Sequence, residues 1–407
     1  MVRQQQKEMN MKLNRHNTVW KGYMTGKRLL AAFLGASLLL SGCGPAGGSQ
    51  GAFDASSEEN GKLKVAVTLF PYYDFVRQIA GDQVDLQMVI PAGMDSHSFE
   101  PTPADIRTIQ HADVLISNGG TMEHWLEDTL GALDTSNMTI VTMMDYVDTV
   151  EEEIVEGMED AGHDHDHAHS HAAADDHDHS HETPEEHAAH AQEADDHDHS
   201  HETPEEHAAH AQETDDHDHS DYVDHDGHEE AIEYDEHIWT SPVNAMKLVD
   251  VIGETLAEAD PAHAEVFRQG AADYKKELEE IDAGFREVSR NRKRNMIVMG
   301  DKFPFRYLAD EYQLDYRAAF SGCSSDTEPS AKTIAYLIDK VKEEQIPVVY
   351  YLELSSHRIS EIIGEETGAE PLLLHSCHNV TRAQFDAGIT YAGLMRQNIE
   401  NLRKGID

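Results

Sequence analysis

Hydrophobic and polar positions in the first part of the chain alternate between the patterns of strands and helices. Three short apolar runs predict buried strands, at residues 64–69, 84–90 and 113–117. Two stretches between them predict helices, at residues 70–80 and 103–111. Gly81 closes the first of these helices, and Pro103 opens the second, as helix N-termini favour. Strands separated by helices indicate βαβ units with a parallel sheet.

The same alternation returns towards the C-terminus. Four further strands are predicted, at residues 295–299, 314–320, 348–352 and 371–374. They alternate with helices such as the one predicted over 333–345. This second set of elements predicts a second α/β lobe with its own parallel sheet.

Two helical stretches, 242–257 and 261–290, separate the halves. In the second stretch apolar residues recur at intervals of three, four or seven, at Phe267, Tyr274, Leu278, Ile281 and Phe285. The predicted fold class is therefore α/β, with two parallel-sheet lobes joined by one long helix. We expect an N-terminal lobe at 62–240, linker helices at 241–294 and a C-terminal lobe at 295–407.

One insert breaks the pattern of the N-terminal lobe. From Gly162 to His228 the chain is almost entirely His, Asp, Glu, Ala and Ser, with a repeated Asp-Asp-His-Asp-His-Ser-His phrase. Imidazole suits Zn, Cu and Ni, and short His-rich tracts indicate metal binding. We expect residues 151–231 to form a disordered loop that binds metal weakly. Its candidate ligands are His163, His165, His167, His169, His171, His177, His179, His181, His197, His199, His201, His217 and His219.

The N-terminus has the order of features of a bacterial lipoprotein signal. Basic residues precede an apolar run at 29–40, which is too short to span a bilayer as a stable helix. The run leads into Leu-Ser-Gly before Cys43, a sequence that is similar to a lipobox. We expect cleavage of residues 1–42, lipid on the Cys43 thiol, a tether at 43–61 and an extracytoplasmic location at the cell membrane. The alternative is an ordinary secretory signal with an incidental cysteine.

The net charge of −47 is extreme and unevenly spread. No Lys or Arg occurs between Arg107 and Lys247. This acidity argues against nucleic acid as a partner and against adsorption to anionic lipid, and it is compatible with gathering cations. Outside the cytoplasm, Cys323 and Cys377 can form a disulfide. The other interpretation, two separate buried thiols, stays open at this stage.

Several histidines lie where predicted strands meet loops. His97 follows the strand at 84–90, and His375 and His378 follow the strand at 371–374. His237 lies between the His-rich insert and the next helix. Ligands of open α/β sheets bind outside the carboxyl ends of the strands, so these histidines are candidate metal ligands.

Several phrases together resemble the metal-binding subunits of bacterial zinc and manganese ABC importers, the cluster A-I solute-binding proteins. They lie at 91–103, 118–125, 235–242 and 305–314, and the likeness covers nearly all of 62–407. A His-rich acidic loop between the first two ligand segments is typical of the zinc members. The resemblance implies two lobes joined by a rigid helix, with the metal in the cleft between them. It also implies a membrane permease and an ATPase subunit as partners.

The resemblance implies four metal-ligand positions. Two of them fall on the expected residue type in this chain, and two do not. The first two match His97 and His237. The third, usually His or Glu, falls on Lys302, whose ammonium has no lone pair, and Asp301 beside it is a possible substitute. The fourth, an Asp in the family, falls on His375, with His378 close by.

This ligand set favours Zn²⁺ as the transported ion. Zinc prefers imidazole and thiolate in tetrahedral geometry, whereas Mn²⁺ sites are rich in carboxylates. We expect His97, His237 and His375 as ligands, with Asp301, His378 or water as the fourth. The alternatives are a manganese- or iron-binding member of the family and a metal-buffering or adhesive surface lipoprotein.

Three histidines with an open fourth position also resemble a catalytic zinc centre. However, the chain has no His-Glu-x-x-His motif. Glu353 is interpreted more simply as a buried structural carboxylate. The sequence therefore predicts a binding protein rather than an enzyme.

Overall fold

The computed structural model describes residue 53 and residues 61–158, 233–324 and 328–407. The predicted signal and tether up to residue 60, including Cys43, lie outside this part of the chain apart from residue 53, as do all the candidate ligands of the His-rich insert. Within the described residues, no helix combines the length and the apolar character that a membrane span needs.

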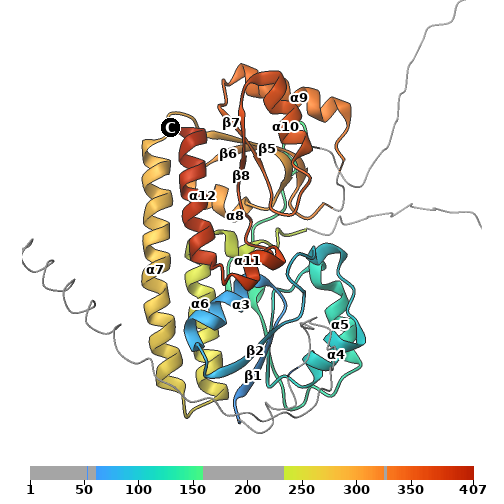
Figure 1. Cartoon of the computed structure of the whole chain (residues 1–407), viewed down its shortest axis with the longest axis vertical. Helices are drawn as coiled ribbons and strands as arrows, with labels where there is room; N and C mark the ends of the chain where they lie inside the picture. The colour runs from blue at the N-terminus through green and yellow to red at the C-terminus, as the bar shows by residue number, and fades with distance from the viewer. Residues whose placement is uncertain (1–52, 54–60, 159–232, 325–327) are drawn as a thin grey trace, which may run out of the picture. The chain divides into compact units, whose positions relative to one another are not determined.

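The first lobe is a four-stranded parallel sheet with the strand order β2-β1-β3-β4 (Figure 1). Its strands are β1 (Leu63–Val67), β2 (Val84–Met88), β3 (Val114–Ser117) and β4 (Thr139–Thr142). Its helices are α3 (Phe70–Ala80), α4 (Pro103–Gln110) and α5 (His124–Gly131). β1 and β3 are fully buried along most of their length, because parallel sheets are covered on both faces.

The second lobe repeats this arrangement with the order β6-β5-β7-β8, again all parallel. Its strands are β5 (Met296–Phe303), β6 (Asp315–Ser321), β7 (Val348–Tyr351) and β8 (Glu370–Leu373). Its helices are α8 (Arg306–Tyr312), α9 (Ala331–Glu343) and α10 (Arg358–Thr367). The pairing of β5 with β6 shifts register between Met299 and Lys302, which marks a bulge at the end of β5.

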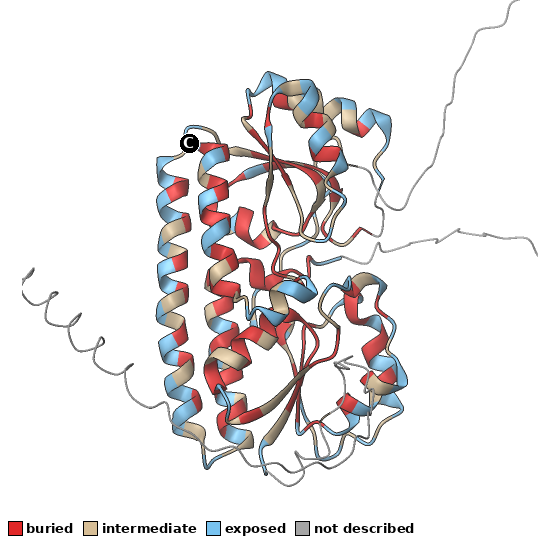
Figure 2. Ribbon diagram, viewed as in Figure 1, coloured by how far each residue is buried: buried red, intermediate tan, exposed pale blue. Residues whose placement is uncertain are grey.

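One long helix, α7 (Ala264–Asn291), runs along both lobes, with α6 (Pro242–Ala259) packed on it beside the first lobe and the C-terminal α12 (Tyr391–Ile406) packed on it beside the second (Figure 1). α7 alternates buried and exposed positions, so one side of it packs against the protein and the other faces solvent (Figure 2). α12 contacts α3 in the first lobe as well as β5, β7 and β8 in the second. The two predicted parallel-sheet lobes and the long connecting helix are thus confirmed.

Trp239 connects the segment after the first lobe to two segments of the second half of the chain. It lies in a short 3₁₀ turn, η4 (Ile238–Thr240), and its side chain is completely buried. Its indole Nε1 donates to the carbonyl of Ser376, 2.8 Å away in the loop after β8. The hydroxyl of Tyr391 at the start of α12 donates to the Trp239 carbonyl at 2.7 Å. Buried Trp and Tyr usually need such partners, and here the partners come from distant segments.

The two cysteines are free, so the disulfide interpretation is wrong. The strands before Cys323 and Cys377 are β6 and β8, the opposite edges of the second sheet. Three strand spacings correspond to roughly 14 Å, whereas a disulfide needs Cα atoms within about 7 Å. The Cys377 thiol is buried and faces the carbonyl of His375 at 3.8 Å, while the Cys323 amide donates to Glu152.

Candidate metal centre

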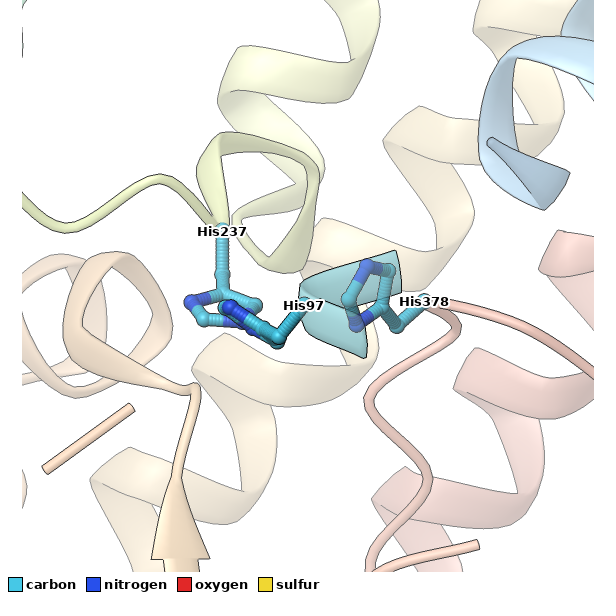
Figure 3. A group of neighbouring side chains, drawn as sticks. All are labelled: His97, His237 and His378. Atoms are coloured by element: carbon cyan, nitrogen blue, oxygen red, sulfur yellow. The ribbon is translucent and has the colours of Figure 1, made fainter. Parts of the chain in front are cut away.

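Three imidazole rings from distant parts of the chain meet between the lobes (Figure 3). They belong to His97, His237 and His378, and one ring nitrogen of each lies within 4.8 Å of the others. Neighbouring ring centroids are 5.6 to 5.9 Å apart. Side chains gathered this closely can converge on one transition-metal ion, because imidazole nitrogen is a preferred ligand of such ions.

The loop after β2 holds His97. Its 3₁₀ turn, η1 (Ser96–Ser98), is capped by Asp95, whose carboxylate accepts a hydrogen bond from the His97 amide at 3.2 Å. The side chain of Asn379 donates to the carbonyls of Pro91 and Met94 at 2.8 and 2.7 Å. Asn379 directly follows His378, so one amide fixes the first-lobe loop against the second-lobe loop.

His237 is buried and held by Asp235. One carboxylate oxygen of Asp235 accepts from the His237 amide at 2.8 Å and contacts ring Nδ1 at 3.2 Å. A carboxylate on Nδ1 fixes the ring and leaves Nε2 for a metal, the usual arrangement of metal-bound histidine. Gly322 lies against the same ring, since a Cβ there would come within 3.3 Å of His237 Cε1 and 3.0 Å of the Asp235 carboxylate.

His378 enters the group from the loop after β8. Cys377 has a positive φ of 61°, an uncommon conformation for a residue other than Gly, and it turns the chain between His375 and His378. The hydroxyl of Ser376 accepts from the His378 amide at 3.1 Å, and the hydroxyl of Ser96 contacts ring Nε2. The His378 ring packs on Trp239 with the ring centroids 5.3 Å apart.

Two of the three imidazoles are neutral well below neutral pH. Burial, followed by the charge of His237, lowers the pKa of His97 to about 4. Burial, followed by His237 and His97, lowers the pKa of His378 well below its usual range. Burial alone would also lower the pKa of His237, but the carboxylates of Asp235, Glu152 and Glu236 together outweigh it and raise that pKa, with Asp235 contributing most among them. His237 is therefore the ring that binds a proton most strongly.

The structure does not bring His375 into this group. Its ring Nδ1 accepts from the Cys377 amide at 3.0 Å and lies 3.4 Å from the Glu353 carboxylate. Its backbone is clamped by Asn398, which accepts from the His375 amide at 2.8 Å and donates to the His375 carbonyl at 2.7 Å. His375 is thus fixed in the interior by Cys377 of its own loop and by Glu353 and Asn398 from other segments, and it is not part of the close group.

Asp301 and Lys302 line the same cavity as the three histidines, but Asp301 is not part of the close group. Its carboxylate accepts from the amides of Lys302 at 2.9 Å and Leu352 at 3.3 Å. These backbone bonds hold Asp301 between the ends of β5 and β7. Asp301 therefore shapes the rim of the site.

Glu353 supports the loop that carries His378. Its carboxylate accepts from the Ser376 amide at 2.8 Å and also contacts the Ser376 hydroxyl. The Ser376 hydroxyl in turn accepts from the His378 amide. These contacts are those of a structural carboxylate, which is the role that the sequence suggested for Glu353.

The cavity in front of the three imidazoles has a volume of about 180 Å³. Met94 and Asp95 line it from the first lobe, and Pro304, Leu352 and Leu354 line it from the second. Both lobes thus contribute to its wall. The cavity has room for a metal ion together with a small additional ligand.

Comparison with known proteins identifies the family. The sequence model of the zinc-uptake complex component A, periplasmic (ZnuA), matches residues 65–405. The chain belongs to the ZnuA family. It is 30% identical over 347 residues to the zinc-binding protein AdcA of Streptococcus pyogenes serotype M18, covering 85% of this chain and 56% of that protein. The chain thus spans just over half the length of this relative.

Other relatives of this ZnuA-family chain are matched over nearly all of their own length. The high-affinity zinc uptake system protein ZnuA of Bacillus subtilis is 26% identical over 369 residues, which cover 91% of this chain and 94% of that protein. The Zn(II)-bound ZnuA-like domain of Streptococcus pneumoniae AdcA is 25% identical with a TM-score of 0.58, covering 85% and 100% of the two chains. The metal-dependent lipoprotein YcdH of Bacillus subtilis shares the fold with a TM-score of 0.59 at 24% identity, covering 85% and 99%.

Sequence reasoning missed the residues that orient the ZnuA-family histidines. Asp235 lies two residues before His237, inside a phrase that already indicated the family, and Ser96 directly precedes His97. An acid this close to a candidate ligand is a usable signal, because metal-bound histidines commonly donate to a carboxylate. Asn379 left no such signal, since its partners lie in the other lobe.

Proposed function

We propose that this protein captures Zn²⁺ outside the cytoplasm and delivers it to the membrane permease of an ABC importer. The observation that carries the proposal is the group of three histidines between the lobes, inside a ZnuA-family fold. The zinc-binding names of the relatives support the choice of ion. An ATPase subunit would power the permease, as solute-binding components of ABC importers work with both.

The chemistry of the donors supports zinc over manganese. All three close donors are imidazole nitrogens, and the nearby carboxylates of Asp95, Asp301 and Glu353 accept hydrogen bonds from backbone amides. Zinc accepts such a nitrogen-rich set in tetrahedral geometry, whereas manganese prefers carboxylate and water oxygens. The proposed ligands are His97, His237 and His378.

Deleting residues 162–230 is expected to leave one tight zinc site per chain. The three proposed ligands lie outside the insert, and the described ends of the insert are paired. The Glu152 amide donates to the Glu233 carbonyl at 2.9 Å, and the Asp235 amide donates to the Val150 carbonyl at 2.9 Å. Because of this pairing, we expect the first lobe to keep its fold when residues 162–230 are deleted. Zinc titration by calorimetry, with elemental analysis of the purified protein, measures the stoichiometry.

The undeleted chain is expected to bind several more zinc ions, each more weakly. Gathering several residues of such a polar, His-rich tract around one ion costs conformational free energy. His237→Ala in the deleted background is the matched control and should bind no zinc tightly. A deleted chain that binds no zinc would make the protein a metal buffer whose only ligands are in the insert.

We further propose that lipid on Cys43 anchors the protein to the outer face of the cell membrane. The lipobox-like sequence supports this proposal, as does the word lipoprotein in the name of the Streptococcus pneumoniae relative. Cys43→Ala is expected to abolish lipid labelling and to release the protein from the membrane fraction. Cys323→Ala, which removes a different thiol, should stay with the membrane. Lipid label on Cys43→Ala would contradict the proposal.

A further inference from the structure

The histidine group leaves one position of a tetrahedral zinc ion open. Among the described residues, the close group contains three metal-binding side chains and no fourth. A zinc ion held by three neutral imidazoles keeps its full double charge and takes its fourth ligand from outside the protein. The identity of that ligand depends on what else lines the cavity.

Lys302 is a half-buried cation in the wall of this cavity. Within the part of the chain that the structure describes, its Nζ forms no hydrogen bond and no ion pair. Its charge acts on the histidines of this cavity. Burial and the neighbouring imidazoles lower the pKa of His97 and His378 most, and the Lys302 charge lowers both further. A cation next to a metal site opposes the metal unless an anion lies between them.

The carboxylates that line the cavity are already engaged elsewhere. Asp95 caps the turn that carries His97. Asp301 accepts from two backbone amides, and Glu353 accepts from the Ser376 amide. None of them is within ion-pair distance of Lys302 Nζ among the described residues. The positive charge of Lys302 therefore has no partner of its own in this wall.

The backbone presents Lys302 to the cavity through the bulge in β5. The pairing with β6 shifts between Met299 and Lys302 and then resumes with Lys302 opposite Phe320. Bulges of this kind lie next to functional sites and redirect side chains. Lys302 lines one cavity with His97, His237 and His378, so a side chain from this position is suited to face the metal.

We propose that Lys302 recruits a small anion, such as a carboxylate, which completes the zinc coordination. The anion would donate one atom to zinc and accept a charge-assisted hydrogen bond from the Lys302 ammonium, bridging the two cations. The cavity of about 180 Å³ has room for both the ion and the anion. This inference rests on the zinc site of the proposed function, and it adds a ligand from solution to the three histidines.

The test uses the full chain loaded with one equivalent of Co²⁺, whose visible bands report coordination, in chloride-free buffer. Acetate is the probe anion, and the full chain with His237→Ala supplies the blank for cobalt bound in the insert. We expect acetate to change the cobalt bands of the wild type. Lys302→Met should raise the half-saturating acetate concentration by about tenfold or more, because one close charge pair is lost. Lys302→Arg, which keeps the charge, should stay within about threefold of the wild type.

Each other outcome overturns the proposal in a recognisable way. Cobalt bands that appear in the wild type but ignore acetate would mean that water alone fills the fourth position. An equal acetate response of Lys302→Met and the wild type would mean that Lys302 does not hold the anion. If the wild type shows no bands beyond the His237→Ala blank, the histidine site itself fails, and the proposed function fails with it.

Discussion

Replacing His378 by Ala is expected to abolish tight zinc binding, whereas replacing His375 by Ala should change the affinity only a few-fold. His378 belongs to the close group with His97 and His237, while the His375 ring is held by the Cys377 amide and Glu353. Loss of an orienting neighbour typically costs about 10- to 100-fold in metal affinity, so the loss of one of three direct ligands should cost more. Competition with a zinc chelator measures both affinities in the chain that lacks residues 162–230.

The comparison is matched in residue type and position, because the two histidines lie three positions apart, with His375 buried and His378 half-buried. Circular dichroism checks that both variants remain folded. His237→Ala gives the reference for a site without a ligand. If His375→Ala lost zinc and His378→Ala bound it like the wild type, the loop after β8 would have to rearrange on binding metal, and the ligand set proposed here would be wrong.

Zinc affinity is expected to fall about tenfold for each pH unit below the pKa of His237, down to about pH 4. Metal binds neutral imidazole, so each ring that is protonated in the free protein releases one proton on binding. Asp235 raises the pKa of His237 above its ordinary value, whereas the pKa of His97 is lowered to about 4 and that of His378 well below its usual range. Between the pKa of His237 and about pH 4, zinc therefore competes with a proton mainly at His237.

The direction in which zinc affinity changes with pH follows from the protonation state of His237 in the free protein. Above the pKa of His237 the ring is neutral and affinity is nearly independent of pH. Below it, the bound proton must leave before zinc enters, so affinity falls with pH by one proton per ion. Calorimetry in buffers of different ionisation enthalpy counts that proton directly in the chain lacking residues 162–230. The deletion removes the histidines of the insert, which would otherwise add their own protons.

A slope of three protons per zinc would show that all three rings titrate together and that burial does not keep two of them neutral. A flat profile from pH 7.5 to 5.5 would indicate a site dominated by carboxylates, and manganese would then become the better candidate. His237→Ala lacks the titrating ring and serves as the control for protons released elsewhere.

Local pattern was enough for most of the fold. The apolar runs and the long amphipathic spacing in 261–290 correspond to β1, β2, β3 and α7 within a few residues, because a buried strand or a buried helix face requires apolar side chains at neighbouring positions. The sequence analysis did not assign β4 or α12. β4 is a short edge strand in which only Val141 is buried, so it carries little apolar signal.

The sequence by itself determined the family phrases, two α/β lobes and His97 and His237 as candidate ligands, since each lies in a recognisable local phrase. Only the tertiary structure brings His378, and not His375, next to His97 and His237. Both His375 and His378 follow the same strand, and the difference depends on the turn at Cys377 and on contacts from Asn398 and Ser96, which lie far away in the chain. Likewise, only the folded chain places Lys302, which has no ion-pair partner among the described residues, in one cavity wall with the three histidines. Which groups share a cavity is a property of the packed chain, and no local pattern records it.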